Sequence, residues 1–180
     1  MKITWKGNDI SDLVNTVTWS GSAYSSARSL EFALPNPAGD PNVKTPNIKT
    51  GDLICFYDGS KKKFHGKVTK RERKGEAGTI SYTAYDYLLY LTRSKGTYKF
   101  KKKTPEQITR LICKDLKIKV KNIAKTKVKI KKMLFTDKEY YNMILAAYTK
   151  ARKKTGTNYQ ILMEGDRLSA VSYTHLRAHE

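Results

Sequence analysis

The sequence predicts a protein of the α+β class, in which a small antiparallel β-barrel is followed by a small α+β domain with two helices and a hairpin. Up to about residue 93, apolar and polar residues alternate in short segments that are separated by turn signals. Residues 94–103 are polar and basic, and from residue 104 the apolar residues recur at helical spacing. We therefore predict a β-barrel-like domain over residues 1–93, a basic linker over 94–103 and an α+β domain over 104–170.

The first part contains alternating segments that are typical of strands. Leu13, Val17 and Trp19 share one face of a segment that is interrupted by Gly21-Ser22. A proline-rich stretch over 35–46 indicates a surface loop, and Asp58-Gly59 is a strong hairpin signal. The predicted strands are residues 2–5, 13–19, 29–34, 52–57, 64–70 and 80–85, with a further turn at 75–78.

The second part begins with a helix signal. Thr104 suits the N-cap, Pro105 the first helical position, and Gln107 completes a capping box. An apolar stripe then follows at Ile108, Leu111, Ile112 and Leu116. Residues 125–133 alternate Val128 and Ile130 with lysines, which predicts an edge strand whose outward lysines discourage aggregation.

A second capping box, Thr136 to Glu139, predicts a helix that runs to about Lys154 and ends at Gly156. After it, residues 159–163 predict a strand, 164–166 a turn, and the residues from Arg167 onward the return strand.

The charge is strongly positive. The chain has 36 lysines and arginines against 16 acidic residues, a net charge of +20. Such a field favours anionic partners, which include nucleic acid, anionic lipid and acidic protein surfaces. Lys61–Lys63 and Lys101–Lys103 lie in predicted turns, where solvated loops are the simplest interpretation and docking on an acidic protein is the alternative.

The cysteines predict no disulfide framework. Cys55 and Cys113 each lie in an apolar stretch, so we expect two buried free thiols. No apolar run is long enough to span a membrane, and the N-terminus has no apolar signal core, so we expect neither a membrane segment nor Sec export.

We predict no catalytic, cofactor-binding or metal site. His65 is a lone histidine in a predicted strand, without a partner or nucleophile that spacing could identify. No nucleophile elbow, zinc-helix motif or phosphate-binding loop is present. No pair of carboxylates is supported by spacing, and Asp86 suits a cap or turn before Leu88. The carboxylates that we considered are Glu31, Asp52, Asp58, Glu72, Glu76 and Asp86.

Aromatic and basic residues leave nucleic-acid binding open as an alternative. Tyr82, Tyr85, Tyr87 and Tyr90 are close in sequence, and a row of exposed aromatics could stack bases. Tyrosines at period two on a strand are equally typical of a core or a protein interface. The basic residues near them are Arg71, Arg73, Lys95 and Lys99–Lys103.

Several segments, in collinear order over residues 1 to about 168, resemble the N-terminal part of the XkdQ/YqbQ-type tail hub proteins of prophages and tail-like bacteriocins. The resemblance is strongest over residues 78–88, GTISYTAYDYL, and 91–98, LTRSKGTY. The other segments are 10–14, 17–21, 27–32, 51–52, 57–59, 108–109, 147–151 and 163–166.

This resemblance implies a structural baseplate hub of a contractile phage tail, in which the full-length protein forms a homotrimer between the tail tube and the spike. It implies an N-terminal β-barrel, an α/β domain and further β-structure, and it transfers no catalytic residue. Partners would be tube and spike proteins, and the location would be the virion tail baseplate, assembled in the bacterial host cytoplasm. A peptidoglycan hydrolase or its accessory is the other alternative, since some relatives are classed as hydrolases.

We expect Trp5 and Trp19 to be structural anchors that are buried in the core, with an interface role as the alternative. Tyr82, Tyr85, Asp86 and Tyr87 are further candidates for interface or structural contacts.

The final residues 171–180, VSYTHLRAHE, resemble a translated sequencing-adapter tail that recurs in unrelated metagenomic proteins. We therefore expect this segment to be non-native and the natural reading frame to continue differently.

Overall fold

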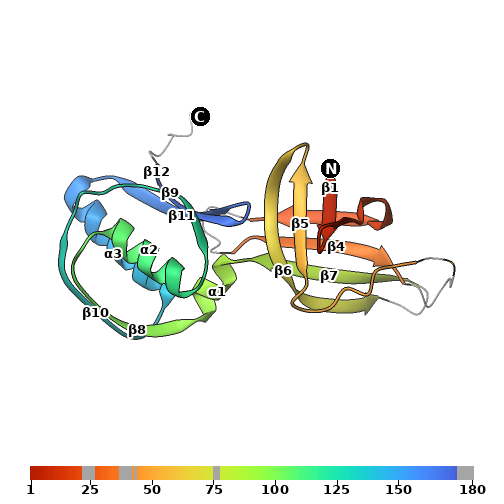
Figure 1. Cartoon of the computed structure of the whole chain (residues 1–180), viewed down its shortest axis with the longest axis horizontal. Coiled ribbons are helices and arrows are strands. Elements are labelled where there is room, and N and C mark those ends of the chain that lie inside the picture. Colours follow the sequence, from red (N-terminus) through yellow and green to blue (C-terminus); the bar gives the residue numbers. More distant parts are fainter. Residues whose placement is uncertain (22–26, 37–41, 43, 75–77, 174–180) are drawn as a thin grey trace, which may run out of the picture. The chain divides into compact units, whose positions relative to one another are not determined.

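The computed structural model describes residues 1–21, 27–36, 42, 44–74 and 78–173. The chain divides into two compact units, Met1–Tyr87 and Leu88–Glu180 (Figure 1). The α+β class is confirmed.

The first unit is one antiparallel sheet that curls into a half-barrel (Figure 1). Its strands lie in the order β2-β1-β5-β6-β7-β4-β3. Trp19 of β3 lies 6.2 Å from Phe56 of β5, ring centroid to ring centroid, although three strands separate β3 from β5 in the sheet order. The strands are β1 (Lys2–Trp5), β2 (Asn8–Asp9), β3 (Thr16–Ser20), β4 (Ser29–Pro35), β5 (Leu53–Asp58), β6 (Lys61–Lys74) and β7 (Thr79–Asp86).

Alternation decides which side chains enter the core of this sheet. Along β7, Ile80, Tyr82 and Ala84 are buried, while the residues between them are more exposed. The Tyr82 ring stacks on Phe32 of β4 at 5.2 Å between centroids. The core is completed by Ile3, Ile10, Leu30, Leu34, Ile48, Ile54, Phe56, Phe64 and Val68.

The β5–β6 hairpin contains a bulge. The turn has Gly59 at a φ of +57°, a conformation that glycine adopts without a Cβ penalty. Asp58 pairs with Lys61 and Tyr57 with Lys62, but Phe56 pairs with Phe64, so Lys63 is an extra residue. The bulge shifts the register by one, and Cys55 therefore faces His65.

The second unit combines three helices with a two-stranded and a three-stranded sheet. Helices α2 and α3 lie between the two sheets (Figure 1). Strands β8 and β10 pair antiparallel, and β12 lies between antiparallel β11 and parallel β9. The elements are α1 (Leu88–Arg93), β8 (Lys95–Lys103), α2 (Pro105–Asp115), β9 (Lys119–Ile123), β10 (Ile130–Glu139), α3 (Tyr140–Thr155), β11 (Asn158–Glu164) and β12 (Arg167–Tyr173).

The predicted capping of the first long helix is confirmed. The Thr104 hydroxyl accepts a hydrogen bond from the Gln107 backbone amide, and the Gln107 side chain accepts one from the Thr104 amide. Gly156 ends α3 at a φ of +71°, as the sequence predicts.

The second predicted capping box is wrong. Thr136–Glu139 belong to β10, and α3 begins only at Tyr140. The side chain of its N-cap residue Glu139 makes no capping hydrogen bond with the helix backbone. The cause is non-local, because β8 provides a pairing partner along residues 130–139. The segment 94–103, for which we predicted a linker, is this partner strand, and Phe100 of β8 is buried. The domain boundaries that we predicted stay a prediction.

Other differences concern element ends. Ser11–Leu13 form a short 3-10 turn, so the strand predicted from residue 13 begins at Thr16. The strand predicted over 125–133 begins at Ile130, and β9 was not predicted. Both lysine runs lie in strands, β6 and β8, where we predicted turns. Residues 75–77 of the predicted turn and 37–41 and 43 of the predicted loop lie outside the described residues.

Candidate interaction surface

Strand β3 is an edge strand with an exposed tryptophan. It pairs with β4 alone among the described strands, and its sequence, TVTWS, contains no charged residue and no proline. Natural edge strands usually carry such residues, which prevent pairing with another chain. Trp19 is 42% exposed, and the Arg28 guanidinium lies 5.7 Å from its ring. The expectation that Trp19 is buried is therefore wrong, because β3 lies at the rim of the curled sheet.

Trp5 belongs to β1, which lies next to β2 at the other end of the sheet order. Its indole Nε1 donates to Asp52 at 2.9 Å, and the Lys6 ammonium lies 2.8 Å from the same carboxylate. Partial burial tends to raise the pKa of Asp52, but hydrogen bonds from the Lys49 amide, Lys6 and Trp5 together lower that pKa to about 2. Trp5 itself is partly buried against the core. An interface role for either tryptophan stays a prediction.

The aromatic cluster of β7 does not form one exposed row. Tyr82 is buried, and Tyr85 lies on the opposite face of the strand. Asp86, at the end of β7, is 1% exposed. Tyr87 stacks on His65 at 5.5 Å between ring centroids. Within the part of the chain that is described, these residues therefore provide no row of free rings on which bases could stack, and their contact roles stay a prediction.

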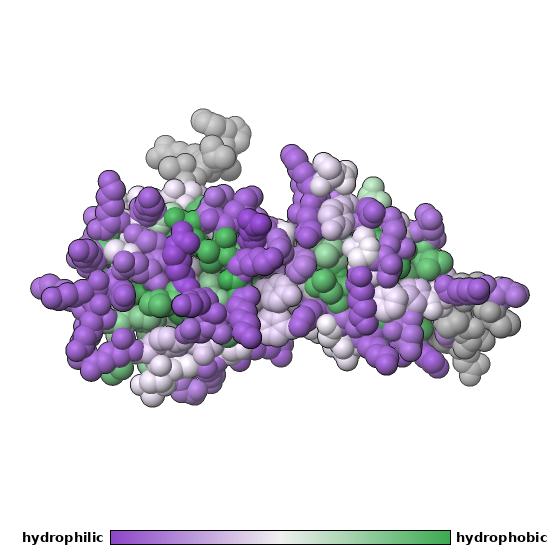
Figure 2. All heavy atoms as spheres, viewed as in Figure 1, coloured by the Kyte–Doolittle hydropathy of each residue, from purple (hydrophilic) through white to green (hydrophobic). Residues whose placement is uncertain are grey.

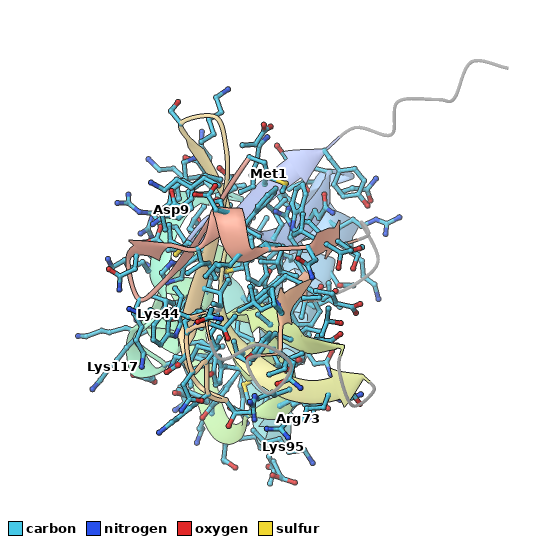
Figure 3. The ribbon with its side chains drawn as sticks, turned by 90° about the vertical axis from the view of Figure 1, so that its right-hand side faces the viewer. Met1, Asp9, Lys44, Arg73, Lys95 and Lys117 are labelled. Carbon is cyan, nitrogen blue, oxygen red and sulfur yellow. The ribbon has the colours of Figure 1, made fainter. Side chains whose placement is uncertain are left out.

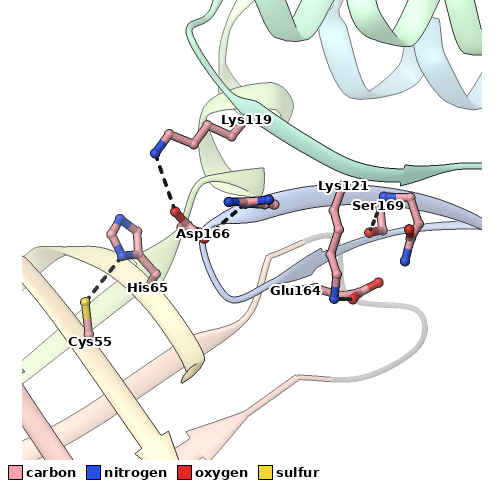
Figure 4. A network of polar contacts seen from close by, with 9 residues as sticks. Cys55, His65, Lys119, Lys121, Glu164, Asp166 and Ser169 are labelled. Atoms are coloured by element: carbon pink, nitrogen blue, oxygen red, sulfur yellow. Dashed lines mark hydrogen bonds and ion pairs between the residues drawn. The ribbon is translucent and has the colours of Figure 1, made fainter. Parts of the chain in front are cut away.

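In the structure, a cysteine thiol lies beside His65, a contact that the sequence analysis did not predict. Cys55 Sγ lies 3.3 Å from His65 Nδ1 (Figure 4). A plain hairpin register after Asp58-Gly59 pairs Cys55 with Phe64 instead, so only the bulge at Lys63 produces this contact. Cys55 is buried, as is Cys113, and both are free thiols, which confirms the prediction made for them.

Several carboxylates of the first unit make hydrogen bonds or ion pairs in the described residues. Asp52 is held by Trp5 and Lys6. Asp58 and Glu72 form surface ion pairs with Lys63 and Lys70, respectively. Glu31 is exposed on β4, Asp86 is buried, and Glu76 lies outside the described residues.

Two ion pairs connect strands within the three-stranded sheet of the second unit. Lys119 lies 3.8 Å from Asp166, and Lys121 lies 2.5 Å from Glu164 (Figure 4). They join β9 to the β11–β12 hairpin, which is consistent with a structural role.

Most of the basic residues of the chain are lysines. Lys44, Lys95 and Lys117 project away from the ribbon (Figure 3). Hydrophilic residues cover most of the face of the second unit that Figure 2 shows.

Two kinds of feature are absent from the ranges that the structure describes. No three or more histidine, cysteine or acidic side chains gather where they could hold a metal ion. No helix there has the length and apolar character needed to cross a membrane.

Comparison with known sequences gives consistent matches. A family model described as YQBQ-like matches residues 17–179. The "Phage-like element PBSX protein XkdQ" of Bacillus subtilis (strain 168) is 30% identical over 157 residues, which are 87% of this chain and 47% of that protein. The protein YqbQ of the same strain is 30% identical over 150 residues, 83% of this chain and 45% of the relative. The chain thus spans about half the length of the curated relatives it matches.

Comparison with solved structures shows a shared fold. The prophage MuSo2 43 kDa tail protein from Shewanella oneidensis has a TM-score of 0.73 at 15% identity, covering 94% of this chain and 53% of that one. The tail protein from Neisseria meningitidis MC58 has a TM-score of 0.67 at 13% identity, covering 94% and 50%. The E. coli c3393 protein has a TM-score of 0.59 at 11% identity, covering 100% and 51%.

Proposed function

Because this chain belongs to the YQBQ-like family, we propose that it is a structural component of a contractile phage tail or tail-like particle. Within the particle, we place it in the baseplate hub that links the tail tube to the spike. In the full-length protein this hub would be a homotrimer, located in the virion tail baseplate and assembled in the host cytoplasm.

The observation that carries this proposal, beside the family, is the open edge of β3. Because its outer N–H and C=O groups are not paired with a described strand, a neighbouring subunit can extend the sheet by main-chain hydrogen bonds. Trp19 beside this edge offers a large side chain of the type that dominates protein interfaces.

The names of the relatives support the same role. The matched XkdQ is described as a protein of a phage-like element, and two of the solved structures are described as tail proteins. The c3393 protein is described as a type VI secretion component with structural similarity to the T4 bacteriophage tail proteins gp27 and gp5. We propose the corresponding partners, tube and spike, for this chain.

We further propose that the role is mechanical and not enzymatic. The contacts of the carboxylates described above are those of structural ion pairs and hydrogen bonds. We propose neither a small-molecule substrate nor a membrane or nucleic-acid partner.

Mass spectrometry of sedimented tail particles from the induced source strain tests the location. We expect peptides from residues 1–167 together with tube and sheath proteins. Intact particles that lack these peptides would contradict the proposal. The same digest tests the final residues, since trypsin releases 168–177 as one peptide if the printed terminus is native.

Substitution of Trp19 tests the interface. We expect Trp19→Ser to reduce the number of complete particles, counted by electron microscopy in a strain that carries only the variant gene. Thr18→Ala is the matched control, because Thr18 is exposed on the other face of β3. Equal particle numbers for the two folded variants would refute the interface role of Trp19.

A further inference from the structure

A groove in the second unit brings together six lysines from two separate segments of the chain, residues 129–132 and 150–154. It lies where the start of β10 meets the last turns of α3 and has a volume of about 290 Å³. Val128 and Ile130 line it together with the lysines, which are Lys129, Lys131, Lys132, Lys150, Lys153 and Lys154.

These lysines have no acidic partner in the described part of the chain. The eight ion pairs found there involve other cations, and none reaches this groove. Lys153 and Lys154 lie in the last turn of α3, where the helix dipole favours cations. That dipole has a partial negative charge of only about half a unit, so most of the positive charge is left for an external anion.

The lining favours a protein partner over a nucleic acid. It contains no aromatic ring on which a base could stack and no arginine that could bind phosphate in a bidentate manner. Val128 is partly buried and Ile130 is buried, so apolar side chains stand beside the ammonium groups. An acidic segment that also carries an apolar side chain matches both features.

We propose that this groove binds an acidic, extended segment of a protein partner. Carboxylates of the segment contact the lysines of β10 and α3, and one of its apolar side chains packs between Val128 and Ile130. This inference does not depend on the proposed place of the chain in a tail, because it rests on the groove alone.

Fluorescence anisotropy with a labelled peptide of alternating glutamate and leucine tests the proposal on the whole chain. We expect saturable binding that weakens with added salt, and no binding of the matched glutamine–leucine peptide. The double variant Lys150→Gln/Lys153→Gln should weaken binding by about tenfold. The control Lys44→Gln/Lys61→Gln removes two exposed lysines of the first unit and should leave binding within about twofold.

Equal losses in the two double variants would overturn the proposal, because they would show attraction by net charge alone. A labelled single-stranded oligonucleotide that binds more tightly than the peptide and loses affinity in the groove variant would overturn it in favour of nucleic acid. Lysine acylation of the unmodified protein gives an independent measurement. We expect the bound peptide to protect Lys150 and Lys153 but not Lys44, and uniform labelling would refute the site.

Discussion

Replacement of Gly66 by alanine should destabilise the first unit strongly. An ideal Cβ on Gly66 lies 2.2 Å from the Tyr85 carbonyl oxygen and 2.6 Å from Phe64 Cζ. The first distance is about 0.8 Å shorter than the 3.0 Å below which real Cβ contacts essentially never occur. Tyr85 belongs to β7, which pairs with β6, so its carbonyl moves only if the ladder is distorted. We therefore expect a loss of about 3 kcal/mol in the free energy of unfolding.

Tryptophan fluorescence measures this loss selectively, because both tryptophans of the chain, Trp5 and Trp19, lie in the first unit. A loss of about 3 kcal/mol corresponds to a Tm decrease of about 12–24 °C for a unit of this size. Gly59→Ala is the matched control. Its Cβ meets nothing within 4 Å, so only the left-handed φ opposes it, at about 1 kcal/mol. If Gly66→Ala unfolds no more readily than Gly59→Ala, the steric argument is wrong.

Three further predictions concern single side chains. The low pKa of Asp52, about 2 against an ordinary 3.8, means that its contribution to stability is complete above pH 4 and is lost as the pH falls through 2. Asp52→Asn should reduce the loss of unfolding free energy at low pH, which the fluorescence of Trp5 measures. An unchanged loss in this variant would refute the contribution of Asp52 to stability. Thr104→Ala should cost about 1 kcal/mol and accelerate amide exchange in α2, and unchanged exchange would contradict the capping role. Burial raises the pKa of Cys113 to about 12, so this thiol should react with a disulfide reagent at pH 8 only after unfolding, and rapid reaction of the native chain would contradict its burial.

Two similar capping sequences show where local reasoning succeeds and where it fails. The box at Thr104 and Gln107 forms as predicted, since its donors and acceptors lie within four residues of each other. The box over 136–139 has the same local pattern, but these residues extend β10 instead. The free energy of pairing with β8 depends on a segment more than thirty residues earlier, which a local pattern does not contain.

The sequence by itself determined the α+β class, the hairpin at Asp58-Gly59, the capped start and apolar stripe of α2, the buried thiols and the resemblance to the family. These properties depend on periodicity, on turn chemistry or on residue order, all of which are local or collinear. The tertiary structure alone decided that β3 lies at the edge of the described sheet, that Cys55 meets His65, and that lysines of β10 and α3 line one groove. Each of these depends on which distant segments pair and in which register, and one bulged residue such as Lys63 changes the contacts of the residues that follow it.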